Sequence, residues 1–462
     1  MQSRDFKKLV IVLLDSDYLK FVNNKPHMKT GSGIFIVVFL LFLFPERMFG
    51  QEDKMIERIN LALIASDYKL ALHLCDSAIH NQHISAELFY KQSIAYRSVY
   101  HYKKAYKSIE NALDLNPNNI NIRIEFGKVC YVLNMLNSAD SVFSEIFKFD
   151  TTNYVSGIYL TRIYIKKEEF DKAFSVYKTL SEMDSLNNYL FRQMGICKIK
   201  DKKSKKAIPY LQRAIEIDST DIKSYGYLSK IYQALKEYDL ALSFLNKAIQ
   251  IEPLNSELYF DLGEFHYYRS HHFQAIPAYL TAIKLGYNDP WIFRSIGTSY
   301  YLIKDFQKAK KFLLIAIQEF KDPDTYHRLG KIYLELNQPD SSSIYLERSL
   351  GLLLTEPITL FSLYSDLAQS YIKKQEYEKA ILRYEKISNI EFKKYPGNYY
   401  KNQAIIGIAK IYEQNLNDKK KAIECYMKII NNKDKANFQK QIEYAEDKVN
   451  RLREELFFEG KK

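Results

Sequence analysis

The chain contains 462 residues, of which 47% are hydrophobic and 26% are charged, with 15 glycines and 11 prolines. These proportions are typical of a folded protein and exclude collagen-like, low-complexity and wholly disordered classes. The 67 lysines and arginines exceed the 55 aspartates and glutamates by 12, which permits acidic partners without requiring nucleic acid. The cysteines are too few and too scattered for a disulfide scaffold. They are Cys75, Cys130, Cys197 and Cys425.

The first feature along the chain is an unbroken apolar run from Ile34 to Phe44. A helix of that length spans about 16 Å, roughly half of a bilayer core. This length favours the hydrophobic region of a signal peptide over a membrane-spanning helix. The alternative is that residues 34–44 remain as an uncleaved anchor in the inner membrane.

Met28 and the lysine that follows it read as an initiator methionine with a short basic region. Gly50 supplies a small residue at the end of the segment, where signal peptidases cleave. We therefore predict a signal peptide (or membrane anchor) over 28–50, with 1–27 an upstream extension or an artefact of start-site choice. Export predicts a location in a bacterial cell envelope, in the periplasm or associated with the outer membrane.

The rest of the chain repeats itself every 34 residues. A column of alanines recurs at this interval without exception, and tyrosine and glycine columns share its register. Such a period is the signature of a repeat architecture. The alanines are Ala71, Ala105, Ala139, Ala173, Ala207, Ala241, Ala275 and Ala309.

Within one repeat the apolar residues follow helical spacing. In the repeat 86–119, two segments each place apolar side chains three, four or seven residues apart, which predicts two amphipathic helices. A short polar turn separates the segments, and Asn116 and Pro117 end the second helix because proline cannot donate the required hydrogen bond. Each repeat is therefore predicted to be an antiparallel helical hairpin.

These columns closely resemble the tetratricopeptide repeat (TPR) family. The repeat Ser256–Asp289 shows the family's pattern in Tyr259, Leu262, Gly263, Ala275, Tyr279 and Ala282. The resemblance implies an all-α fold, a right-handed superhelical α-solenoid of about eleven repeats. The predicted repeats begin near Glu52, Ala86, Ile120, Tyr154, Asn188, Ile222, Ser256, Pro290, Pro323, Phe361 and Asn402.

The array is regular over 52–356, as nine repeats, and two further repeats with insertions follow over 357–436. The insertions lie near 357–360 and 395–401, and they are expected to kink the superhelix or to form a functional loop. A last amphipathic segment over 437–458 predicts a helix that caps the final repeat.

No catalytic constellation appears in the array. The G-x-x-x-x-G-K-[ST], G-x-S-x-G, H-E-x-x-H and C-x-x-C motifs are missing from the sequence, so we predict no enzyme, no catalytic residue and no cofactor. His266, His271 and His272 form the best metal candidate, but they fall at a turn, where solvated surface histidines are the simpler interpretation. Cys75 and its counterparts on helical faces are interpreted as small hydrophobic residues.

The basic runs, one over 198–206 and one over 419–421, each lie at an isolated turn. A nucleic-acid surface would need basic residues aligned across neighbouring repeats with interleaved aromatic residues. The runs are therefore interpreted as solvated loops, and no nucleic-acid partner is expected.

The resemblance to TPR proteins implies that the first helix of each repeat lines a concave groove that holds peptide segments or helices of partner proteins. The residues expected to line it are aromatic or basic, which suits acidic or mixed segments. The family's carboxylate-clamp pattern is not present. We call this set the first-helix row: Tyr90, Arg97, Lys128, Tyr131, Arg162, Tyr189, Arg192, Lys230, Phe260, Tyr267, Trp291, Arg294, Tyr301, His327 and Lys331.

These observations predict a non-enzymatic scaffold for protein–protein interactions in the cell envelope, similar to envelope TPR proteins of bacteria. The alternative is a membrane-anchored sensory or regulatory TPR protein that acts through partner binding and touches the membrane only through the N-terminal segment.

Overall fold

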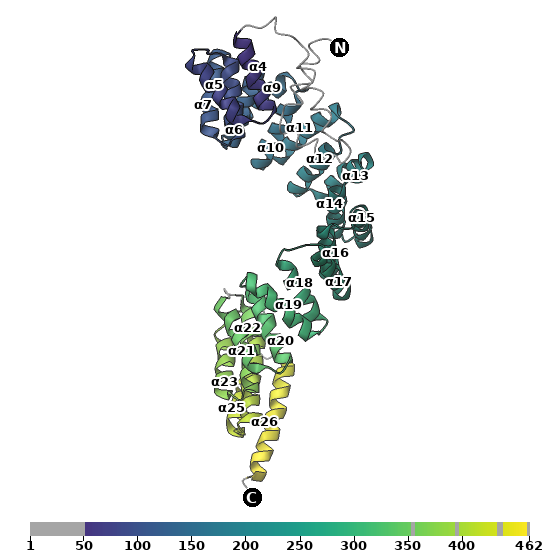
Figure 1. The fold of residues 1–462 in the computed structure, drawn as a ribbon. Coiled ribbons are helices and arrows are strands. Elements are labelled where there is room, and N and C mark those ends of the chain that lie inside the picture. Colours follow the sequence, from purple (N-terminus) through teal and green to yellow (C-terminus); the bar gives the residue numbers. More distant parts are fainter. Residues whose placement is uncertain (1–50, 353–355, 393–396, 432–437, 460–462) are drawn as a thin grey trace. The chain divides into compact units, whose positions relative to one another are not determined.

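The computed structural model describes most of the repeat array (Figure 1). The described residues are 51–352, 356–392, 397–431 and 438–459.

The predicted extension (1–27) and signal peptide (28–50) lie outside the described residues. Within the described ranges the chain forms 23 α-helices, one 3-10 helix, one π-helix and no strand. The predicted all-α class is confirmed.

The chain divides into two compact units, Met1–Ser224 and Tyr225–Lys462, which we call the N-terminal and C-terminal units. The helices described in the N-terminal unit are α4 (Gln51–Ile64), α5 (Tyr68–His80), α6 (Ala86–Ser98), α7 (Tyr102–Leu115), α8 (Ile120–Val132), α9 (Leu136–Phe149), α10 (Tyr154–Lys166), α11 (Phe170–Met183), α12 (Asn188–Lys200), the 3-10 helix (Ser204–Ala207) and α13 (Ile208–Ile217).

The division falls within α14 (Ile222–Ala234). The helices described in the C-terminal unit are α15 (Tyr238–Ile251), α16 (Ser256–Tyr268), α17 (His272–Lys284), α18 (Trp291–Leu302), α19 (Phe306–Glu319), α20 (Pro323–Glu335), α21 (Pro339–Leu352), α22 (Pro357–Lys373), α23 (Tyr377–Ser388), α24 (Gly397–Lys410), the π-helix (Ile411–Asn415), α25 (Lys419–Ile430) and α26 (Gln439–Glu459).

Every hairpin has one residue in the left-handed backbone conformation between its two helices. Eleven such residues with φ between 52° and 64° mark eleven hairpins in the described chain. In ten of them the next residue donates a backbone hydrogen bond to a carbonyl five positions earlier, as His101 N does to Tyr96 O at 2.9 Å. This bond closes the end of the first helix in the Schellman geometry. The left-handed residues are Ser66, Tyr100, Asn134, Glu168, Lys202, Lys236, Ser270, Lys304, Asn337, Gln375 and Asn417.

The small-residue columns lie where the two helices of a hairpin approach each other. All eight alanines of the 34-residue column have no exposed surface. The glycine column serves the same purpose: a Cβ atom on Gly127 would lie 2.7 Å from Cζ of Phe143, closer than real Cβ atoms come. A side chain at this position would therefore push the helices apart.

The insertion at 357–360 does not form a loop, because these residues form the first turn of α22. Pro357 occupies the start of that helix, where a missing N–H costs nothing. The later insertion behaves similarly, since residues 397–401 belong to α24, whereas 395–396 lie outside the described residues.

The predicted C-terminal cap is confirmed as α26. Ile442, Ala445, Val449 and Leu452 lie on its buried face and pack against the core formed by α24 and α25. A polar contact adds to this packing: Glu413, in the π-helix, accepts hydrogen bonds from Nζ of Lys448 at 2.8 Å and from the hydroxyl of Tyr426 at 3.0 Å. Arg451 also pairs with this carboxylate.

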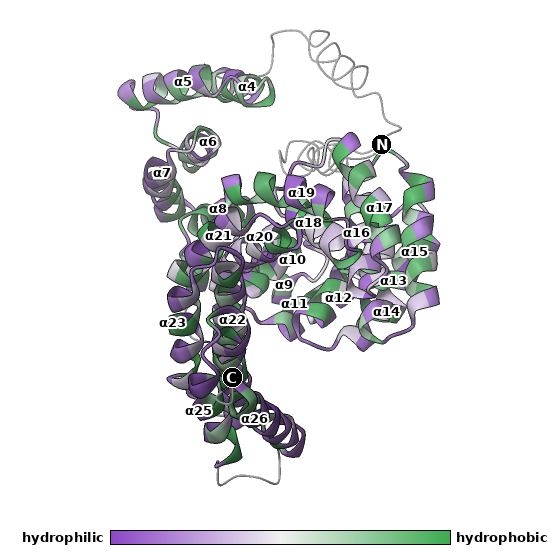
Figure 2. Ribbon diagram, turned by 90° about the horizontal axis from the view of Figure 1, so that it is seen from below, coloured by the Kyte–Doolittle hydropathy of each residue, from purple (hydrophilic) through white to green (hydrophobic). Residues whose placement is uncertain are grey.

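Helices of the described chain carry hydrophilic and hydrophobic residues in alternation along their length (Figure 2). None of them combines the length and the apolar character needed to cross a bilayer.

Candidate functional site

All fifteen residues of the first-helix row lie on the first helices of repeats two to nine. Seven of them belong to the N-terminal unit, on α6, α8, α10 and α12, and eight belong to the C-terminal unit, on α14, α16, α18 and α20. Lys128 is an exception to the expected exposure, because its side chain is buried against the ring of Tyr159, with Nζ 5.9 Å from the ring centre.

Two arginines of the row in the N-terminal unit are bound to acidic residues of the following repeat. Arg97 donates from Nε to Oε1 of Glu125 at 2.6 Å and from Nη2 to Oε2 at 3.3 Å. Nη1 of Arg192 lies 2.6 Å from Oδ2 of Asp221. Both carboxylates are buried, so each ion pair joins neighbouring repeats and removes one positive charge from the surface.

The same arrangement recurs in the C-terminal unit. Lys230 pairs with Asp261 at 3.1 Å, and Nε of Arg294 lies 3.1 Å from Oδ2 of Asp322. Nε2 of His327 lies 2.7 Å from Oδ2 of Asp366. In each case the partner is 28 to 39 residues later in the chain, on or just before the next first helix.

These acidic partners were not predicted from the sequence, because they belong to a neighbouring repeat rather than to the repeat of the basic residue. The sequence does contain a signal for these pairs. Asp221 and Asp322 occupy equivalent positions, each directly before a first helix, α14 or α20. An arginine in the first five residues of the preceding first helix, Arg192 or Arg294, then reaches the carboxylate in both units. The row is consequently less basic than its composition suggests.

Basic and aromatic side chains also meet on α8 and α10. The guanidinium of Arg162 lies 5.1 Å from the ring centre of Tyr159, and Nζ of Lys166 lies 4.4 Å from that of Tyr131. The two tyrosine rings meet edge to face at 5.5 Å. Such contacts hold the cations in fixed positions. Tyr159 and Lys166 were not among the predicted residues, because neither shares a position of the period with the residues of the first-helix row.

Helix α16, in the C-terminal part of the row, has the opposite charge. Helix α16 contains three carboxylates and no lysine or arginine. The ring of Phe260 stacks on Tyr287 at 4.5 Å, and burial followed by the nearby carboxylates of Asp289 and Asp261 raises the pKa of Tyr287 to about 12. Glu264 accepts a hydrogen bond from the hydroxyl of Tyr279 at 2.5 Å. This segment does not suit an acidic ligand.

The three histidines at the α16–α17 turn are partly buried rather than fully solvated as predicted. His266 and His271 lie with ring centres 6.2 Å apart, and His272 packs edge to face against Tyr267. Burial lowers the pKa of His266 and His272 below the ordinary histidine value. Among the residues that the structure describes, no three His, Cys, Asp or Glu side chains are arranged to hold a metal ion.

The four cysteines are free and buried, which confirms their role as small hydrophobic residues. Burial raises the pKa of the Cys75 and Cys197 thiols to about 12 and that of Cys130 to about 11. Thiols with such pKa values stay protonated near neutral pH and are poor nucleophiles.

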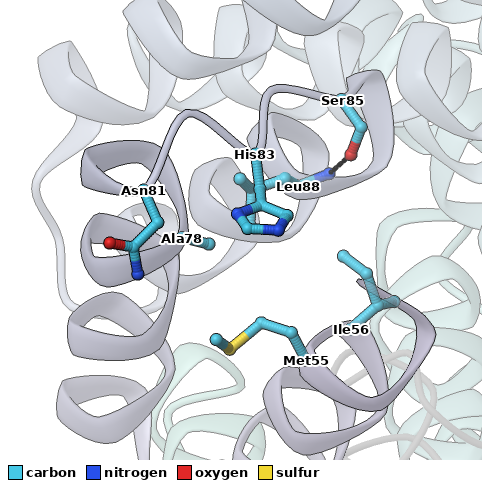
Figure 3. A pocket seen from close by; sticks show the side chains of 7 residues that line it. All are labelled: Met55, Ile56, Ala78, Asn81, His83, Ser85 and Leu88. Carbon is cyan, nitrogen blue, oxygen red and sulfur yellow. Dashed lines mark hydrogen bonds between the residues drawn. The ribbon is translucent and has the colours of Figure 1, made fainter. Parts of the chain in front are cut away.

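A small pocket lies at the start of the array, where α4, α5 and α6 meet (Figure 3). Its volume is about 230 Å³. Apolar side chains form most of its wall, and three polar residues come from the turn between α5 and α6 and its flanks. The lining residues are Met55, Ile56, Ala78, Asn81, His83, Ser85 and Leu88.

Comparison with known proteins identifies the repeats. A family model described as "Tetratricopeptide repeat" matches residues 222–253, 323–352 and 403–435. The first two matches coincide with the hairpins α14–α15 and α20–α21, and the third lies over α24 and α25. These three segments are tetratricopeptide repeats. The family resemblance and the all-helical repeat fold predicted for the chain are confirmed.

Curated TPR relatives are distant. A TPR repeat-containing protein of Methanocaldococcus jannaschii is 25% identical over 264 residues, which cover 57% of this chain and 39% of that protein. A BBSome complex member BBS4 homolog of Drosophila melanogaster is 26% identical over 178 residues, which cover 38% of this chain and 37% of that protein. The TPR chain thus spans less than two-fifths of the length of these relatives.

Solved structures similar to this TPR chain include yeast Tom70, at 16% identity and a TM-score of 0.33, covering 87% of this chain and 96% of Tom70. YrrB, described as a TPR protein with an unusual peptide-binding site, is 19% identical with a TM-score of 0.34. The match covers 41% of this chain and 98% of YrrB.

Proposed function

We propose that this TPR protein is a non-enzymatic scaffold that binds segments of partner proteins along its first-helix row. The observation that carries the proposal is the cluster on α8 and α10, where Arg162 and Lys166 are held on the faces of Tyr159 and Tyr131. Tyrosine supplies rigid contact area and arginine binds carboxylates, the two properties that recur in strong protein contacts. TPR repeats themselves support a role in protein interaction.

The chemistry of the partner follows from charge. Helices α10 and α12 contain five lysines and arginines and no acidic residue. Two of the five are already paired, Arg192 with Asp221 and Lys198 with Asp171. The absence of acidic residues from these two helices favours an acidic or mixed segment on the N-terminal unit, whereas the acidic helix α16 disfavours one in its own part of the row.

Charge reversal tests this proposal. We expect Arg162→Glu combined with Lys166→Glu to abolish recovery of the partners that wild-type protein captures, because the two carboxylates would repel an acidic segment. A matched double variant, Lys107→Glu with Lys178→Glu, changes two exposed lysines on the second helices α7 and α11. This variant should still capture the same partners. The measurement is affinity capture with quantitative mass spectrometry, with circular dichroism to verify folding.

Equal recovery with both double variants would contradict the proposal. Arg192 and Arg294 are left unchanged in this design, because reversing either would place two like charges at a buried or partly buried inter-repeat ion pair and disturb the fold.

We further propose that the scaffold is exported to the cell envelope after removal of residues 28–50. The support is the length of the apolar run Ile34–Phe44 and its placement after a basic residue. We expect full-length protein with a C-terminal tag, expressed in a Gram-negative host, to be recovered from the periplasm or outer membrane with a mass that begins at Gln51. A mass that retains the run, in the inner membrane, would instead favour the anchored regulatory protein.

A further inference from the structure

A second surface of the N-terminal unit, separate from the first-helix row, exposes large apolar side chains at the turns that join one repeat to the next. We define the turn edge as these turns, residues 81–85, 116–119, 150–153 and 184–187, together with the helix ends beside them. Phe149 is 92% exposed and Leu186 is 74% exposed. The exposed large hydrophobic residues of the turn edge are Ile84, Leu115, Ile120, Phe149, Met183 and Leu186.

These side chains lie along one edge because the repeats are in strict register. Leu115, Phe149 and Met183 are successive members of one column, 34 residues apart, each at the end of a second helix. The left-handed residues of the hairpins keep the same interval through this unit, so equivalent positions follow one another from repeat to repeat. Isolated exposed hydrophobic residues need no explanation, but a column of them marks an interaction surface.

The pocket of about 230 Å³ lies at one end of this edge, since Asn81, His83 and Ser85 belong to or border its first turn. In Figure 3 the ring of His83 stands between Leu88 and Met55, above the apolar wall. A cavity of about 150 Å³ is enough to hold a benzene ring. The pocket therefore accommodates one phenylalanine, leucine or methionine side chain of a ligand, which gives the edge an anchor point of the kind that dominates protein interfaces.

The charges beside the apolar column are negative. Asp114, Asp150, Glu182 and Asp184 lie at the helix ends and turns of the edge, and Lys148 is the basic residue among the same positions. A partner surface that complements this pattern carries lysine or arginine between apolar side chains.

We propose that the turn edge of the N-terminal unit is a docking surface for a basic amphipathic segment of a partner protein, with one large apolar side chain of that segment seated in the pocket. This inference is independent of binding at the first-helix row, and it assigns the scaffold a second site with the opposite charge preference.

A peptide pair tests the docking surface on the full-length protein. The probe is a fluorescently labelled helical peptide of Leu, Phe and Lys, and its counterpart has Glu in place of every Lys. We expect saturable binding of the lysine peptide, measured by fluorescence anisotropy, and a dissociation constant raised about tenfold by Phe149→Ser with Leu186→Ser. Asp114→Lys with Glu182→Lys should weaken binding similarly, and both pairs are exposed enough to leave the fold intact.

The control is Phe273→Ser, which removes a phenylalanine that is 75% exposed from α17 in the other unit and should not change the affinity. Arg162→Glu with Lys166→Glu should also leave it unchanged, which separates this surface from the first-helix row. Equal binding of the glutamate peptide, equal loss in Phe273→Ser, or no saturable binding below about 1 mM would overturn the proposal. So would a wild-type dimer in sedimentation that Phe149→Ser converts to a monomer, because the occupant would then be a second copy of the chain.

Discussion

Replacing Arg97 by alanine is expected to lower the free energy of unfolding of the N-terminal unit by about 3–5 kcal/mol. The reason is the carboxylate that would be left behind: the side chain of Glu125 is 3% exposed, and both of its oxygens accept hydrogen bonds from Arg97. A buried charge that loses its partner cannot recover its hydration, so the loss exceeds the net value of the pair itself.

Hydrogen exchange of α6 and α8 measures this effect locally, which is appropriate because a repeat array need not unfold in one step. The matched control is Arg213→Ala, which breaks an ion pair of 3.0 Å with Glu216 in which both side chains are exposed, and it should cost about 1 kcal/mol or less. The double variant Arg97→Leu with Glu125→Leu should recover much of the lost stability. A loss at Arg97 no greater than at Arg213 would contradict the role of burial.

Glu413→Gln is expected to destabilise the C-terminal end of the array by about 3 kcal/mol at neutral pH. Burial alone would raise the pKa of Glu413, but hydrogen bonds from Lys448 and Tyr426 and the charge of Arg451 outweigh it and hold the pKa below the ordinary value of 4.5. The glutamine cannot balance the Lys448 ammonium, which is itself largely buried.

The pH dependence of this effect has a defined sign. Because the pKa is lower in the folded state, the carboxylate stabilises the protein above the unfolded value and loses that contribution as the pH falls through the folded value. The difference in thermal midpoint between wild type and Glu413→Gln should therefore be full near pH 7 and shrink as the pH drops below about 4.5. Glu454→Gln, an exposed change on α26, should show no such convergence. A difference that stays constant with pH would refute the proposed role of this carboxylate.

The positions of the hairpins were predictable because every repeat has to satisfy the same packing requirement. Over the first nine repeats the expected starts agree with the helices to within one residue, since small residues and turns recur at a fixed interval. The two last repeats begin earlier than predicted, because the inserted residues lengthen α22 and α24 instead of forming loops. Pro357 was the overlooked signal, as proline favours the first turn of a helix.

The location of these fifteen residues on the first helices was predictable, but their electrostatics were not. Periodicity places a residue on a face of its own helix, whereas the ion pair of Arg97 with Glu125 depends on two repeats being stacked. The burial of Lys128 has the same origin, because Tyr159 comes from the following repeat. Properties that arise between repeats become visible only when equivalent positions are compared across neighbouring repeats.

The left-handed residues between paired helices have a consequence for synthesis on the ribosome. All eleven in the described chain are non-glycine residues, for which this backbone conformation costs about 1–2 kcal/mol. A single hairpin that has just emerged bears this cost with only its own internal contacts to offset it, and the next hairpin supplies the missing interface. Stable structure should therefore lag behind translation by about one repeat, and the newest hairpin should stay open to chaperones and proteases until its successor appears.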